Sequence, residues 1–158
     1  LKPLEGLIQE EAGRGVFLYH LARASLAFRP PLGFLGRLQA PKGRVDLKRG
    51  GIAPIVSLAR LYGLLAQSRE KSTPRRLAAA AQKGILSEKT AEGLTEAYAF
   101  LFGLRLEHQL WALKQGIPLT HEVEVKTLSA REAERLMEAF HLIAQVQAYT
   151  AERFQIRL

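Results

Sequence analysis

The chain has 158 residues and contains no cysteine and no asparagine, a single aspartate, a single methionine and a single tryptophan. Without cysteine, disulfide scaffolds, thiolate metal sites and cysteine nucleophiles are excluded. The scarcity of thermolabile residues beside abundant Arg, Glu and Leu is typical of a protein from a thermophile, although a GC-rich genome produces a similar bias. We therefore expect a protein that uses no cysteine chemistry and that comes from a thermophile.

Long apolar runs are absent as well. No stretch approaches the roughly 18 uninterrupted apolar residues of a membrane span, and the first residues lack the pattern of a secretion signal. We therefore expect a soluble, cytoplasmic protein that does not contact a membrane. Hydrophobic residues still make up 47% of the chain, which is enough for one globular domain with a buried core. Because the chain begins with Leu1 rather than Met, we also expect a piece of a longer protein.

Positive charge is concentrated in the first half of the chain. Residues 1–85 contain 15 Lys and Arg but only 5 acidic residues, whereas residues 86–158 contain 8 and 10. Such a field attracts nucleotides, RNA or an acidic protein surface in a salt-dependent way. A surface of solvated charges without a partner is an equally acceptable interpretation.

The spacing of apolar residues predicts an all-α fold, a bundle of five to seven helices built on two long antiparallel helices. The expected helices run from 15 to 28, from 54 to about 67, from about 73 to near 84, from 88 to about 115, and from about 130 to the C-terminus. Gly and Pro residues interrupt 32–48, where we expect an ordered loop or a short β-ribbon.

Local signals mark the helix ends. Ser72 and Ser87 are expected to cap the helices that follow them, and Ser129 with Glu132 forms a capping-box pattern. Gly116 is expected to end the first long helix. Each long helix carries one apolar stripe, formed by Leu94, Ala97, Leu101, Leu104, His108 and Trp111 in the first, and by Leu136, Phe140, Ile143, Gln147, Thr150 and Phe154 in the second.

Asp46 is the only aspartate, and this limits the chemistry of the chain. Nucleotidyl transfer by two metal ions needs two or three clustered carboxylates, typically an Asp-x-Asp pair after a Gly-Ser turn. No such pair is present, and Glu122 and Glu124 lie in what we interpret as a short linker. We therefore expect no catalytic residue, no metal site and no cofactor in this chain.

The four histidines show no metal-binding spacing, and no nucleophile elbow accompanies Asp46, so neither a zinc site nor a hydrolase triad is expected. His108 follows Arg105 on the stripe of the first long helix. It either points into a groove between helices or is a core histidine bonded to a carbonyl group or to Gln147. Both interpretations stay open.

The segment from Arg44 to Ile52 has the sequence Arg-Val-Asp-Leu-Lys-Arg-Gly-Gly-Ile. Two glycines before a helix allow close approach of a ligand to the backbone and leave N–H groups pointing outward, and Lys48 and Arg49 add positive charge beside them. A phosphate site is one interpretation, and an ordinary basic turn is the other. Asp46 is also a candidate ion-pair partner for Arg49 or Arg60.

The order of these segments resembles the nucleotidyltransferase substrate-binding domain known as the DUF294 C-terminal family, from about residue 21 to residue 154. The resemblance is carried by Pro30 to Phe34, Asp46 to Val56, Leu58 to Tyr62, Gly84 to Ser87, Ala99 to Leu101, Leu104 to Gln109, Leu128 and Ser129, Glu134 and Arg135, and Ala139 and Phe140. The Asp-Leu-Lys-Arg-Gly-Gly block is its most specific part. Ser57 replaces a usual Asp, which puts an ion pair with Arg60 in doubt, and Ser72 replaces a common Asn.

The resemblance implies a bacterial helical domain that follows a nucleotidyltransferase catalytic domain in one polypeptide, often with CBS or cyclic-nucleotide-binding domains that serve signal transduction. The arrangement is similar to that of the uridylyltransferase of the nitrogen-regulatory PII protein. Mg²⁺ and a nucleoside triphosphate are then expected in the catalytic domain, and a nucleotide or a protein as the acceptor substrate. The candidate binding residues are Asp46, Lys48, Arg49, Gly50, Gly51, Arg60, Arg105 and His108.

Two other functions fit the sequence. One is a docking module whose basic half binds RNA or an acidic protein, and the other is a bundle that makes the parent protein a homodimer. Only the resemblance favours the accessory, non-catalytic role over these.

Overall fold

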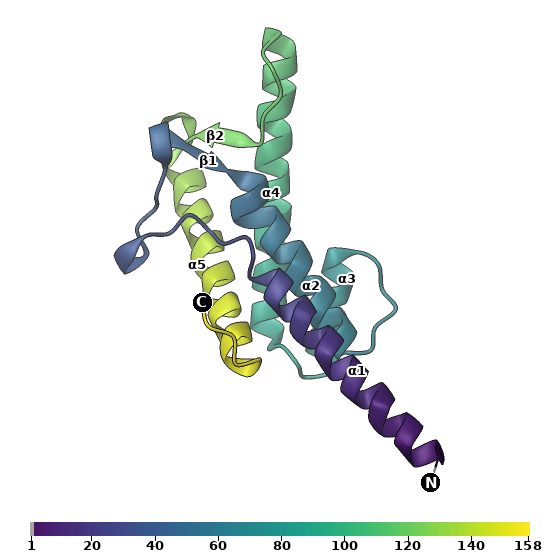
Figure 1. Ribbon diagram of the computed structural model, residues 1–158. Helices are drawn as coiled ribbons and strands as arrows, with labels where there is room; N and C mark the ends of the chain where they lie inside the picture. The colour runs from purple at the N-terminus through teal and green to yellow at the C-terminus, as the bar shows by residue number, and fades with distance from the viewer. Residues whose placement is uncertain (1) are drawn as a thin grey trace.

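Two long helices form the spine of the molecule, as Figure 1 shows. A computed structural model describes residues 2–158. Helix α4 spans Glu88–Gln115, helix α5 spans Ala130–Arg153, and the two run in opposite directions. Ser87 and Ser129 cap these helices through their side chains, the second within a full capping box, and α4 ends at a left-handed Gly116. The predicted spine and its end signals are confirmed.

Three further helices pack against the spine. They are α1 (Lys2–Ser25), α2 (Ala53–Leu65) and α3 (Thr73–Gln82). In the described part of the chain the other regular structure is a two-stranded sheet and a few short helical turns. The predicted all-α bundle is therefore confirmed. None of these helices is long and apolar enough to cross a bilayer.

Two helix starts differ from the prediction. α1 begins at Lys2 instead of residue 15, and Figure 1 shows that its first half projects away from the bundle. The apolar residues Val16 and Phe17 are exposed, whereas Leu18 and Leu21 are half-buried against the core and Ala22 is buried, so only part of the predicted apolar face is covered. The backbone of Ser72 has the extended conformation of an N-cap, but its hydroxyl makes no capping hydrogen bond. Pro74, in the first turn of α3, lacks an N–H group and so reduces the number of donors to cap.

The core is formed where α2, α4 and α5 meet. Leu94, Ala97, Leu101 and Leu104 of α4 are buried, as are Leu136, Phe140, Ile143, Gln147 and Thr150 of α5. The predicted stripe of α4 is wrong at its end, because His108 is only half-buried and Trp111 is 55% exposed. Figure 1 shows the reason: the C-terminal half of α4 extends beyond the other helices.

A short antiparallel ribbon joins two distant segments. Strand β1 (Arg44–Asp46) pairs with β2 (Glu122–Glu124), with the buried residues Val45 and Val123 opposite each other. The predicted ribbon near 32–48 is thus present, but its partner strand lies in the segment that we interpreted as a linker. Short helical turns flank the strands at Phe34–Gly36, Pro41–Gly43, Lys48–Ile52 and Val125–Thr127.

Tyr62 fastens α2 to α5. Its hydroxyl lies 2.7 Å from Thr150 Oγ1, and Thr150 Oγ1 donates to the carbonyl oxygen of Val146, so Tyr62 is the donor of the first bond. Burial raises the pKa of Tyr62 above its ordinary value of 10.0. The protonated phenol therefore stabilises the fold fully below that ordinary value, and the contribution is lost as pH rises through the raised value.

We expect Tyr62→Phe to lower the free energy of unfolding by about 1 kcal/mol at neutral pH, the usual worth of one such hydrogen bond. Urea titrations of both proteins at about pH 8 and about pH 11 test the cause. The native protein should lose stability relative to the variant between these two values. A constant difference would contradict a role for the buried phenol's proton.

Candidate functional site

Asp46 holds the basic turn in place. One carboxylate oxygen, Oδ1, accepts a hydrogen bond of 2.9 Å from the backbone N–H of Arg49, three residues later. This is the geometry of an N-cap, which satisfies a free amide in the first turn of a helix. Within the described residues Asp46 forms no ion pair, so the proposed pairing with Arg49 or Arg60 is not what the structure shows. Its role in the turn is to fix the backbone.

Gly50 and Gly51 face the core of the protein. They lie in the π-helical turn Lys48–Ile52, which continues directly into α2, and both are buried. A Cβ atom on Gly51 would lie 2.5 Å from Leu101 Cδ1, and one on Gly50 would lie 2.9 Å from Pro31 Cδ. Protein side chains occupy the space beside both α-carbons, so a ligand cannot approach the glycines from that side, and their part in a binding site stays a prediction. The missing side chains allow Gly51 to pack against Leu101 of α4, Gly50 against Pro31, and both against Phe140 of α5.

Lys48 and Arg49 are exposed on the outside of this turn. The guanidinium carbon of Arg49 lies 5.6 Å from the centre of the Phe28 ring, within the range of a cation–π contact. Within the described residues neither cation forms an ion pair, so both are available to an anion. The turn therefore presents two exposed positive charges from a backbone that Asp46 and the packed glycines hold in place.

The other predicted site residues lie elsewhere. Arg60 is exposed on α2, about three helical turns beyond Arg49. Arg105 is half-buried on α4, where its guanidinium carbon lies 5.0 Å from the ring centre of Phe102 and its buried Nε has no hydrogen-bond partner. His108 lines a groove, and the suggested bond to Gln147 is wrong, because the amide nitrogen of Gln147 donates to the carbonyls of Ser25 and Phe28 and its amide oxygen has no hydrogen-bond partner.

A groove at His108 was one of the two interpretations of the sequence, but its walls are not two helices as expected. It has a volume of about 850 Å³ and lies between α4, the segment that follows it, and the β-ribbon. Its wall is mostly apolar, and its lining includes Trp111, Ala112, Ile117, Pro118 and Leu119, with Glu107, His108 and Thr120 as polar groups. A volume of this size suits a small organic ligand or a short peptide segment.

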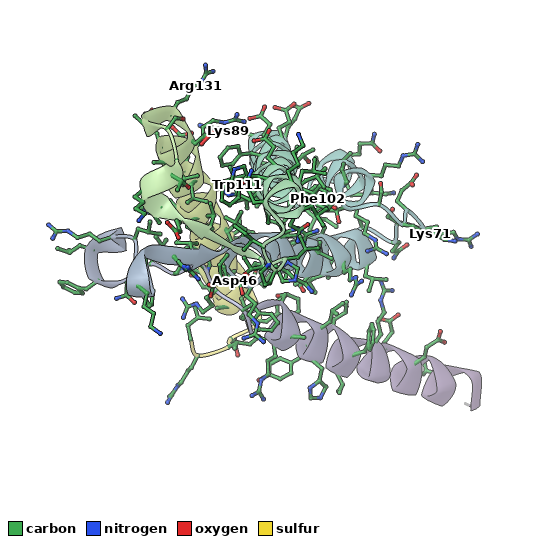
Figure 2. The ribbon with its side chains drawn as sticks, turned by 90° about the horizontal axis from the view of Figure 1, so that it is seen from above. Asp46, Lys71, Lys89, Phe102, Trp111 and Arg131 are labelled. Carbon is green, nitrogen blue, oxygen red and sulfur yellow. The ribbon has the colours of Figure 1, made fainter. Side chains whose placement is uncertain are left out.

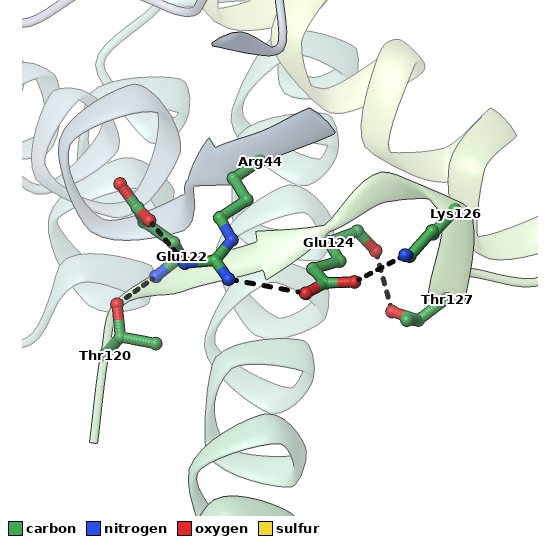
Figure 3. Close-up of polar contacts among 6 residues, drawn as sticks. All are labelled: Arg44, Thr120, Glu122, Glu124, Lys126 and Thr127. Carbon is green, nitrogen blue, oxygen red and sulfur yellow. Dashed lines mark hydrogen bonds and ion pairs between the residues drawn. The ribbon is translucent and has the colours of Figure 1, made fainter. Parts of the chain in front are cut away.

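The ribbon supplies the charged rim of the groove, as Figure 3 shows. Arg44 lies between two carboxylates, with its guanidinium nitrogens 3.9 Å from Glu122 Oε2 and 3.5 Å from Glu124 Oε1. Lys126 approaches the second oxygen of Glu124 at 3.5 Å. These pairs are half exposed, so they stabilise the fold little, but they set the positions of the charges.

The groove and the basic turn are neighbours because of the strand register. Arg44 and Glu122 line the groove, and Asp46, which caps the turn, is the residue paired with Glu122 across the ribbon. The sequence signal that could have predicted the ribbon is the matching pattern of its two strands. Arg-Val-Asp and Glu-Val-Glu both alternate polar residues with valine, which predicts half-buried strands. Among the described residues, no three His, Asp or Glu side chains gather as a metal site would require.

The comparison with protein families assigns the chain. The family model described as "Putative nucleotidyltransferase substrate binding domain", the DUF294 C-terminal family, matches residues 15–154. The chain therefore belongs to this family. No curated protein and no solved structure matches it.

Proposed function

We propose that this chain is a non-catalytic, substrate-binding domain of a bacterial nucleotidyltransferase. The parent protein would carry a covalently linked catalytic domain that binds Mg²⁺ and a nucleoside triphosphate, together with CBS domains that regulate it in cytoplasmic signal transduction. The observation that carries this proposal is the membership of residues 15–154 in a nucleotidyltransferase substrate-binding family. The geometry of the turn and the groove supports it.

The turn suits the phosphate part of a substrate. Lys48 and Arg49 present two positive charges from a backbone that Asp46 and the packing of Gly51 hold rigid. Fixed cations stabilise phosphate charge without reorganising during a reaction. The neighbouring groove offers an apolar wall with Trp111 for the organic part of the acceptor. Together they would orient an acceptor while the metal ions stay in the catalytic domain.

We expect Lys48→Ala combined with Arg49→Ala to lower the turnover of the full-length enzyme about tenfold, equivalent to the loss of one or two charged contacts. Turnover of the parent protein at saturating nucleotide measures this. The matched control is Arg69→Ala with Lys71→Ala, which removes two exposed cations from the segment between α2 and α3. Equal turnover in both double variants would remove the turn from the site.

The strong positive charge of the first half favours one rival, a docking module for RNA. Titration of the 158-residue chain with random RNA at several salt concentrations separates the two functions. Tight binding with a steep salt dependence supports the rival. Binding of a nucleotide that disappears in the Lys48→Ala, Arg49→Ala variant and is not displaced by random RNA supports a substrate site.

A further inference from the structure

Helix α4 carries a second apolar stripe on the face opposite its buried one. Phe102, Leu106, Leu110 and Leu113 follow one another at spacings of four, four and three, so they share one face of the helix. Their exposed fractions are 40%, 47%, 49% and 60%. Figure 2 shows Phe102 and Trp111 leaving α4 in different directions, so this stripe is separate from the groove.

The stripe is accessible because α4 is longer than the bundle. Its C-terminal half extends past the other helices, and its buried positions end with Leu104 except for Ala112. Surface apolar residues are normal when they are scattered, but a continuous stripe on a helix marks a contact surface. The question is which partner has a complementary surface.

The charges beside the stripe match a second copy of the same helix. Glu107 and Lys114 lie seven residues apart, two turns along α4, on the same flank of the stripe, and both are exposed. In an antiparallel helix pair the same flanks of the two helices face each other, so Glu107 of one copy would meet Lys114 of the other, twice by symmetry. We propose that the chain forms an antiparallel homodimer through the exposed stripe of α4.

The register follows from the two charge pairs. With Leu110 against Leu113 of the second copy, twice by symmetry, Glu107 and Lys114 of the two copies lie within about 3 Å of each other along the axis, which their long side chains can span. A parallel pair would place Gln109 opposite Lys114 and leave Glu107 facing Phe102. The sequence of the stripe therefore complements itself in only one of the two orientations.

The absence of cysteine permits a direct test of orientation. When the single variants Leu110→Cys and Leu113→Cys are mixed, we expect a short thiol-specific cross-linker to join one to the other in high yield. Leu106→Cys alone should not be joined, because in the antiparallel register its two copies lie roughly 16 Å apart along the axis. Efficient cross-linking of Leu106→Cys to itself would show a parallel pair and overturn the proposal.

Charge reversal tests the register independently. Three turns of helix make a small interface, so we expect dissociation constants in the micromolar range, measured by sedimentation equilibrium of the 158-residue chain. Lys114→Glu or Glu107→Lys alone should weaken association about tenfold, because each creates two like-charge contacts. The double reversal restores both pairs and should return the constant to within about twofold of the original. Failure of this rescue would contradict the alignment.

Leu110→Glu places a charge in the centre of the stripe and should leave a monomer at every concentration. The matched control is Leu64→Glu, at a residue of α2 that is 43% exposed, which should leave the dimer intact. Circular dichroism verifies that both variants fold. A native chain that is monomeric up to high micromolar concentration, or a Leu110→Glu variant that still dimerises, would overturn the proposal. The Leu110→Glu test is independent of the substrate-binding role, because Leu110 does not line the groove, whereas Glu107 does and its charge reversal is therefore read by association alone.

Discussion

Replacing Gly51 with alanine should lower the free energy of unfolding by about 2 kcal/mol. The added Cβ would lie 2.5 Å from Leu101 Cδ1 and 3.4 Å from Phe140 Cε1. Leu101 and Phe140 are fully buried, so neither side chain can move aside without disturbing the core. The cost of this overpacking exceeds the gain that alanine normally brings to a helix by reducing the flexibility of the unfolded chain.

Gly103→Ala is the matched control. Gly103 lies in α4, and a Cβ added there meets no atom within 4 Å, so the variant should be as stable as the native chain or more stable by about 0.5 kcal/mol. Urea unfolding of both variants measures the difference. If Gly51→Ala proved as stable as Gly103→Ala, Gly51 would not be a packing residue, and the interpretation of the Gly-Gly pair as a ligand contact would regain its basis.

The helices of the bundle could be predicted because their signals are local. Ser129 with Glu132 and Gly116 act on amides and carbonyls within one helical turn of themselves, and the structure shows them doing so. Five of the six predicted stripe residues of α5 are buried as the spacing indicates, and the sixth, Phe154, follows the helix and is half-buried. Periodicity predicts burial correctly only where a neighbouring element is present. It fails at Trp111, where α4 extends beyond its neighbours.

The ribbon and the groove depend on a contact between residues about eighty positions apart. Val45 pairs with Val123, and strands of three residues are too short for their alternation to stand out from the surrounding sequence. The role of Gly50 and Gly51 likewise depends on residues that are distant in the sequence. Their composition is compatible with a phosphate loop and with a packing contact, and only the positions of Leu101 and Phe140 decide between them.

The candidate site was predicted in part. The exposed cations Lys48 and Arg49 lie together on a turn capped by Asp46, as expected of a basic loop before a helix. Arg60 is exposed about three helical turns beyond Arg49, and Arg105 is half-buried on α4 against Phe102. Their part in substrate binding stays a prediction, as does that of the turn itself.

Gln147→Glu should have the largest effect of the changes considered, a loss of about 3 kcal/mol at neutral pH. Gln147 is fully buried, and its amide nitrogen donates to the carbonyls of Ser25 at 3.2 Å and Phe28 at 2.8 Å. These bonds satisfy carbonyls at and beyond the C-terminal end of α1, which have no partner within that helix. A carboxylate cannot donate, so the substitution would place negative charge against two carbonyl oxygens.

The dependence on pH identifies this cause. Burial and the two carbonyls should raise the pKa of the introduced carboxyl above the value of about 4.3 expected in the unfolded chain. A raised pKa means that the variant is least destabilised below that unfolded value and loses further stability as pH rises through the folded one. Gln145→Glu, at an exposed position of the same helix, provides the control and should leave stability nearly unchanged. Unfolding measured at about pH 4 and about pH 7 should therefore show a gap between the two variants that widens with pH. A gap that stays constant would mean that the loss of the two amide hydrogen bonds, and not buried charge, destabilises the protein.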